Sequence, residues 1–198
     1  MTILLLGVLL WSVVHLFPIF MPSARADGLA RLGEGPYKGL FTLLIVLSLV
    51  MIVFGWRWAG EAGYVGDIYN EDWPRHLTHL LLLFAIILFG AAKAPTRIRR
   101  IIRNPMLTGM VLWSIGHLLV NNDPRSLVLF GGMLIWSVLS IIGTNRRDGA
   151  YVPPAVKSWA TEVRIVLISV VVYVVLIVVH PYFTGMEAMD LGFLPSIF

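Results

Sequence analysis

The chain has 198 residues, of which 58% are hydrophobic and 13% are charged, and it contains no cysteine. Soluble domains carry about 25% charged residues, so this composition excludes a soluble globule and predicts a membrane protein. The lack of cysteine excludes disulfides, iron–sulfur ligation and thiolate nucleophiles. The net charge of +4 does not predict a nucleic-acid partner, because no aromatic residues interleave the arginines and no binding motif occurs.

Six apolar runs follow one another along the chain, and each approaches the roughly 20 residues that a helix needs to cross a bilayer. We therefore expect one all-α domain over residues 1–198, a polytopic membrane helix bundle with about six transmembrane helices. The fourth run is the shortest and the most polar. No internal repeat is evident. The expected spans are residues 3–20, 40–59, 76–93, 106–120, 126–143 and 165–180.

Basic residues are unevenly divided between the two sides of the expected bundle. The loops after the first, third and fifth spans hold 12 of the 15, whereas the opposite side holds Arg57, Arg75 and Arg125. By the positive-inside rule, we expect both termini on the non-cytoplasmic side. The same charge is expected to attract anionic lipid. The twelve are Arg25, Arg31, Lys38, Lys93, Arg97, Arg99, Arg100, Arg103, Arg146, Arg147, Lys157 and Arg164.

Five histidines carry most of the chemistry open to this chain. A histidine inside a membrane helix costs free energy unless it is paired, so it indicates either a function or a hydrogen bond between helices. With a helix rise of about 1.5 Å per residue, His15 and His117 are expected to lie farthest from the membrane surfaces, and His79 lies at nearly the same depth as His117. His76 and His180 fall at the outer membrane edge, where we expect no chemistry from them.

One interpretation of the deep imidazoles is haem b, held by axial ligands from two helices of the bundle. The axial ligands would be His15 and His117, with His79 as a rival. Three residues on the same span as His117 would shape the pocket. Ser114 lies one turn before the histidine, and two glycines let a helix or a flat macrocycle approach closely. The three are Gly109, Ser114 and Gly116.

Two other interpretations stay open from the residues alone. His76 and His79 are three apart and share one helix face, with Glu71 and Asp72 nearby, which is a weak pattern for a metal cluster. The remaining interpretation is that the histidines only form hydrogen bonds between helices.

Several segments, taken together, resemble the NnrU family of membrane proteins over nearly the whole chain. Members are associated with bacterial nitrogen-oxide respiration, where they are linked to nitrite and nitric oxide reductase function. The plant and algal 15-cis-zeta-carotene isomerases are relatives that use haem b to isomerise a polyene double bond. The resemblance thus implies haem b and the bacterial inner membrane. The segments are HLFP (15–18), RNPMLTG (103–109), LWSIGHLLVNND (112–123), SLVLFGG (126–132) and HPYFTG (180–185).

Carried over from the isomerases, the haem histidines match His15 and His117. Ser114 stands where the isomerases have a cysteine proposed as an alternative ligand, and serine is a poor iron ligand. Asn104 replaces the histidine of the Arg-His-Pro that the family block usually shows. We expect the Asn104 side chain to cap the fourth span, with Pro105 at its first helical position.

We expect a haem b protein that acts as a redox or accessory component of denitrification and other nitrogen-oxide metabolism, with nitrite or nitric oxide reductase components as partners. The first alternative is an enzyme, a haem-dependent cis–trans isomerase of a lipophilic polyene held in the apolar bundle. The second is a non-catalytic assembly factor. It is motivated by the lack of an acid/base pair, a nucleophile or a nucleotide loop.

Overall fold

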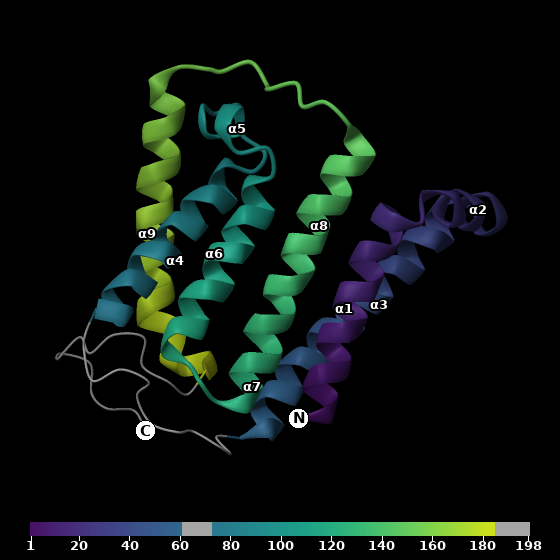
Figure 1. Ribbon diagram of the computed structural model, residues 1–198, viewed down its shortest axis with the longest axis horizontal. Helices are drawn as coiled ribbons and strands as arrows, with labels where there is room; N and C mark the ends of the chain where they lie inside the picture. Colours follow the sequence, from purple (N-terminus) through teal and green to yellow (C-terminus); the bar gives the residue numbers. More distant parts are fainter. Residues whose placement is uncertain (61–72, 185–198) are drawn as a thin grey trace.

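The structure, a computed structural model, describes residues 1–60 and 73–184. Throughout these two ranges the regular structure is helical (Figure 1), which confirms the all-α expectation. Successive long helices run in opposite directions along the bundle. The long helices are α1 (Thr2–Phe20), α3 (Glu34–Ala59), α4 (Trp73–Ala91), α6 (Pro105–Val120), α8 (Gly132–Asp148) and α9 (Trp159–Thr184).

Five helical stretches are long and apolar enough to cross a membrane: α1, α3, α4, residues 124–148 and α9. The sixth, α6, has 16 residues and is therefore about 24 Å long. The six spans of the sequence analysis match these helices approximately. The largest differences are extensions: α3 begins at Glu34 rather than residue 40, and α9 begins at Trp159 rather than residue 165. Helices continue past the apolar run because their charged ends stay in water.

The remaining helices are short. They are α2 (Pro22–Leu32), α5 (Ile98–Ile101), α7 (Pro124–Ser126) and the π-helical turn η1 (Leu127–Gly131), which leads directly into α8. Asp123 starts α7 by accepting a hydrogen bond from the Ser126 backbone N–H at 3.1 Å. Thus α7, η1 and α8 form one continuous helical stretch with a π-turn near its start, a feature that is frequent at functional sites.

The start of α6 differs from expectation at one residue. Pro105 is the first helical residue, as expected, but the Asn104 side chain forms no cap. Its Nδ2 instead donates to Oδ1 of Asn145 on α8, at 2.8 Å. A bond between two helices replaces the cap because α8 brings an acceptor amide to this end of α6. At the other end, Nδ2 of Asn121 donates to the His117 carbonyl at 2.8 Å.

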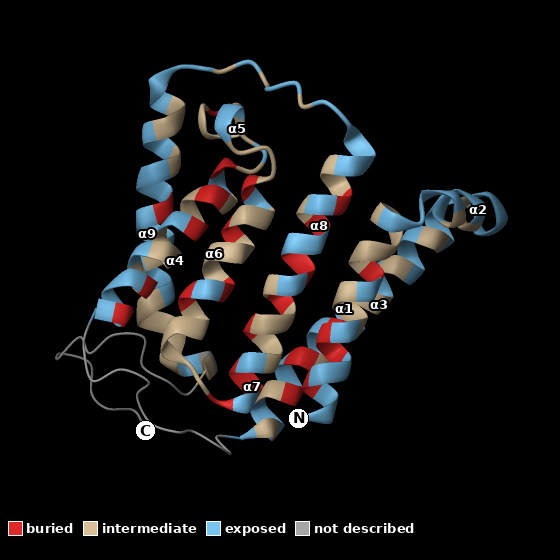
Figure 2. Ribbon diagram, viewed as in Figure 1, coloured by how far each residue is buried: buried red, intermediate tan, exposed pale blue. Residues whose placement is uncertain are grey.

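The helices pack as two antiparallel pairs, α1 with α3 and α4 with α6, and α8 contacts both α1 and α6. Helix α9 lies against the outer side of α4. Figure 2 shows buried residues on the sides that the helices turn toward one another, and exposed residues over most of α9. The outward surfaces carry many exposed large apolar residues, as expected where lipid covers the bundle.

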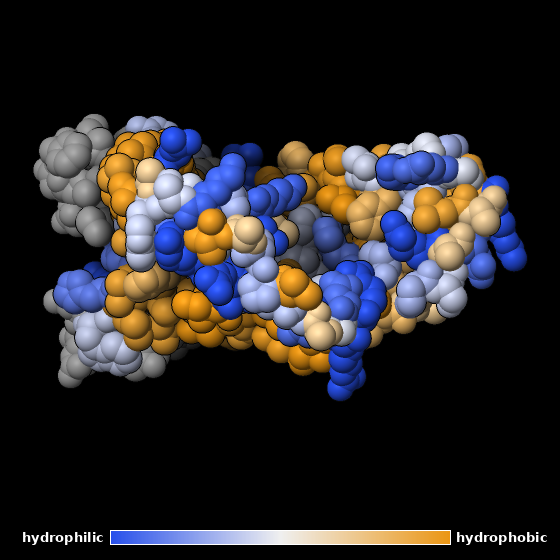
Figure 3. Space-filling model, turned by 90° about the horizontal axis from the view of Figure 1, so that it is seen from above, coloured by the Kyte–Doolittle hydropathy of each residue, from blue (hydrophilic) through white to orange (hydrophobic). Residues whose placement is uncertain are grey.

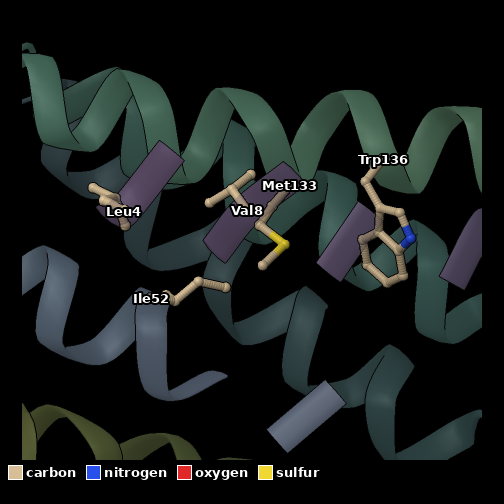
Figure 4. Close-up of a cluster of buried hydrophobic side chains, with 5 residues drawn as sticks. All are labelled: Leu4, Val8, Ile52, Met133 and Trp136. Carbon is tan, nitrogen blue, oxygen red and sulfur yellow. The ribbon is translucent and has the colours of Figure 1, made fainter. Parts of the chain in front are cut away.

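Close approach of α1 and α3 depends on glycine. A Cβ on Gly55 would come within 2.4 Å of the Leu4 backbone nitrogen, so only glycine fits here. Where α8 joins this pair, a cluster of buried side chains forms the core (Figure 4). Its members are Leu4, Val8, Ile52, Met133 and Trp136.

The loops that carry most of the lysines and arginines gather at one end of the bundle, the upper end in Figure 1. Seen from that end, hydrophilic residues cover much of the face, and hydrophobic residues form its margins (Figure 3). This arrangement is the one that a bilayer requires, with an apolar girdle and a polar cap.

Candidate functional site

His15 lies on α1, one turn after Trp11. Its Nδ1 is 2.8 Å from the Trp11 carbonyl oxygen. A carbonyl oxygen only accepts hydrogen bonds, so Nδ1 carries the proton and donates it. Nε2 therefore keeps its lone pair. Histidines that bind metals usually donate their other ring N–H in this way, which fixes the ring orientation.

Aromatic rings from three helices surround His15. Its ring centroid is 4.1 Å from that of Trp11, 5.5 Å from that of Trp136 on α8 and 6.1 Å from that of Phe41 on α3. Figure 4 shows the indole nitrogen of Trp136 turned away from the apolar cluster.

Buried polar atoms without a hydrogen-bond partner in the described residues occur on α1 and α8, the helices of Trp11 and Trp136. Within the described ranges, Nε1 of Trp11, Nε1 of Trp136 and Oγ of Ser140 are buried and have no hydrogen-bond partner. Most buried donors are satisfied in native proteins. A group bound beside His15 would therefore need acceptor atoms for the two indole N–H groups.

His117 repeats the backbone geometry of His15 on α6. Its Nδ1 is 2.8 Å from the Trp113 carbonyl oxygen, so Nε2 again keeps the lone pair. The imidazole stacks on Phe130 with a centroid distance of 4.4 Å and an interplanar angle of 17°. Phe130 belongs to the π-turn η1, so the irregular turn helps to set where this ring lies.

Polar groups near His117 come from α6 and α9, and Arg125 of α7 is connected to it through the Trp56 and Phe130 rings. Ser114, one turn earlier on α6, is fully buried, and its Oγ finds no partner in the described residues. His180 of α9 is close enough to interact electrostatically with His117. Arg125 lies over the Trp56 ring at 4.5 Å and 3.5 Å from an Asp123 carboxylate oxygen. His180 was expected to lie at the membrane edge without a role, whereas in the structure it lies near His117, which is in the last turn of α6.

His79 occupies a different position from the other two. Its Nδ1 is 2.7 Å from the Tyr173 hydroxyl oxygen of α9, a hydrogen bond between helices. The residue before it, Thr78, donates from Oγ1 to the Gly116 carbonyl oxygen at 2.8 Å. His79 thus joins α4 to α9.

The two glycines of α6 face α4. A Cβ on Gly109 would come within 2.9 Å of the Ala85 carbonyl oxygen, and one on Gly116 would meet Leu82 at 3.4 Å. Of the two uses that the sequence analysis gave these glycines, close approach of a helix is the one seen here.

His15 and His117 pack against one helical stretch at separate levels. His15 contacts Trp136 and His117 contacts Phe130, six residues earlier, which corresponds to about 9 Å along the axis. The described part of the chain contains no ring contact between the two imidazoles. The structure therefore shows two imidazole positions, each with its own neighbours.

A cluster of metal ligands is not seen. No group of three or more His, Cys, Asp or Glu that could hold an ion occurs among residues 1–60 and 73–184. Glu71 and Asp72, which the sequence analysis placed near His76 and His79, lie outside the described residues.

The backbone geometry shared by the two histidines follows from a repeated motif that the sequence analysis missed. The motif is Gly-x-x-x-Trp-Ser-x-x-His, and in its third copy serine replaces the histidine. Each glycine lies against another helix: Gly7 against α3, Gly109 against α4 and Gly132 against α1. Aligning the chain with itself around each tryptophan would have revealed it. The copies are GVLLWSVVH (7–15), GMVLWSIGH (109–117) and GMLIWSVLS (132–140).

The donor chemistry of each site fits haem iron. Both imidazoles offer an Nε2 lone pair, both have the other nitrogen fixed by a carbonyl, and both stand among aromatic rings that suit a flat apolar macrocycle. Among residues 1–60 and 73–184, the indole nitrogens of Trp11 and Trp136 near His15, and Oγ of Ser114 one turn before His117, are buried without a hydrogen-bond partner. The two imidazoles contact different rings of the same helical stretch, Trp136 for His15 and Phe130 for His117.

The fold and the site together define a multi-pass helical membrane protein with histidines held inside its spans. The chain belongs to the NnrU family: the family model described as NnrU protein matches residues 3–188, which is nearly the whole chain. No curated protein and no solved structure matches it.

Proposed function

We propose that this protein binds haem b through His15 and His117 and acts as a redox or accessory component of nitrogen-oxide metabolism in the bacterial inner membrane. The observation that carries the haem proposal is the repeated Nδ1 bond, which leaves Nε2 of both imidazoles able to ligate. The metabolic role rests on the family, with nitrite or nitric oxide reductase components as the partners.

A bound haem would supply a redox-active iron inside the bilayer. The chain's own contributions are orientation and exclusion of water. The Trp11 and Trp113 carbonyls hold the imidazoles in one tautomer, and the rings of Trp136 and Phe130 keep water from them. Such outer contacts orient a ligand and tune the metal that it binds.

The test is an absorption spectrum of the protein purified in detergent after haem-replete expression. We expect a Soret band that the combined variant His15→Ala, His117→Ala lacks. His76→Ala is the matched control, because His76 is exposed at the start of α4. A wild-type protein without a Soret band, or a double variant that keeps it, contradicts the proposal. Circular dichroism of each variant separates loss of haem from loss of fold.

The two alternatives from the sequence predict other outcomes. An isomerase would convert a poly-cis polyene in a carotenoid-producing host, and would lose that activity in the double variant. An assembly factor would raise reductase maturation even with alanine at every histidine. Ser114, in the place of the isomerases' cysteine, offers no thiolate, so the cysteine-based ligand exchange proposed for the isomerases has no counterpart at this position.

A further inference from the structure

A recess of about 800 Å³ lies at the end of the bundle that carries most of the basic residues. Four elements enclose it: the end of α1, α2, the start of α3 and the end of α8. Gly28 holds α2 close to α3, since a Cβ there would come within 3.1 Å of the Tyr37 ring. Its lining is Pro18, Pro22, Arg25, Leu29, Glu34, Tyr37, Lys38, Phe41, Thr42 and Arg147.

The lining combines positive charge with apolar surface. Three cations line it against one carboxylate, that of Glu34, which is 2.5 Å from the Lys38 ammonium. Arg147 pairs with Asp148 at 2.7 Å. Arg25 forms no ion pair within the part of the chain that the structure describes. An anion entering the recess therefore meets an excess of positive charge.

The apolar part of the lining indicates what kind of anion fits. Pro18, Leu29 and Phe41 line the same recess as the cations. Nearby, Val13 of α1 and Leu43 of α3 are each 63% exposed, which makes the adjoining surface lipid-facing. A small soluble anion would leave the apolar lining in contact with water, and a neutral lipid would leave the cations without a partner.

We propose that this recess binds an acidic phospholipid, with its phosphate between Arg25, Lys38 and Arg147 and an acyl chain against Phe41. Basic pockets between membrane helices at the cytoplasmic side are suited to such headgroups. The lipid would join α2 to the end of α8 by contacting cations on both. The recess and the ring cluster around His15 share one residue, Phe41, whereas the three cations that would hold the phosphate are not part of that cluster.

The test compares two lipids with identical acyl chains, phosphatidylglycerol and phosphatidylcholine, added to the full-length protein in detergent. Native mass spectrometry measures the bound lipid, and the thermal midpoint reports the stabilisation. We expect preferential retention of phosphatidylglycerol. The variants Arg25→Gln and Arg147→Gln should each weaken it about fivefold, which corresponds to about 1 kcal/mol per basic side chain.

Arg31→Gln is the matched control, because Arg31 lies on α2 but does not line the recess. Three outcomes overturn the proposal: equal retention of the two lipids, an equal loss from Arg31→Gln, or full displacement of the lipid by inorganic phosphate. The last would define a site for soluble anions. Unchanged circular dichroism and elution volume show that each variant folds, and the Soret spectrum reports separately on haem.

Discussion

His15 and His117 share a local motif and differ in the rings that neighbouring helices place beside them. His15 sits edge-on to Trp136, beside indole nitrogens that have no acceptor in the described chain. His117 stacks flat on Phe130, which a π-turn presents. In both copies that end in histidine, the tryptophan carbonyl four residues earlier accepts a hydrogen bond from Nδ1, which sets the tautomer. The neighbouring helices then determine which side chains surround each imidazole.

The largest expected effect is on the amount of bound haem, and it distinguishes the contribution of His15 from that of His117. Because the rings pack at different levels, His15→Ala and His117→Ala should each remove only part of the bound haem, and both together should remove all of it. The pyridine haemochrome assay gives the haem bound per chain. If either single variant loses all of its haem, the two imidazoles ligate one iron and lie on either side of the same macrocycle.

The next effect concerns the helix pair that carries His15. Gly55→Ala should lower the thermal midpoint clearly, because its Cβ would overlap the Leu4 backbone at 2.4 Å. Overpacking of this kind typically costs about 1–3 kcal/mol. Gly39→Ala, on the same helix, is the control, since a Cβ there meets nothing within 4 Å. Equal midpoints for the two variants would show that α1 and α3 do not approach this closely.

A smaller effect should appear at Trp136 alone. Trp136→Phe keeps an aromatic ring against His15 but removes a buried N–H that has no partner in the described residues. The haem-free protein should therefore keep its stability within about 1 kcal/mol, since no hydrogen bond is lost. In a His117→Ala background, the Soret maximum of the haem at His15 should move. Trp58→Phe, at a position 68% exposed, should leave it in place.

The sequence predicted the helices well because lipid leaves few other choices for a run of apolar residues. It did not predict what single polar residues do. Asn104 was expected to cap α6 and instead bonds to Asn145. Whether a side chain bonds to its own helix or to another depends on which helix packs beside it, and residue spacing does not contain that information. His180, whose place near His117 comes from α9, was missed for the same reason.

The smallest expected effect concerns the side-chain hydrogen bonds that α1 and α6, the helices carrying His15 and His117, form with α8. The amide pair Asn104–Asn145 joins α6 to α8 at 2.8 Å, whereas no side-chain hydrogen bond joins α1 to α8 in the described ranges. Hydrogen bonds between membrane helices contribute on average about 0.6 kcal/mol. A double-mutant cycle with Asn104→Ala and Asn145→Ala, followed by thermal unfolding in detergent, should give a coupling of that size. Any accompanying spectral change should vanish when His117 is alanine and persist when His15 is, because the amide pair fixes the start of α6, the helix that carries His117. A change that instead requires His15 would show that strain passes through α8 from one imidazole position to the other.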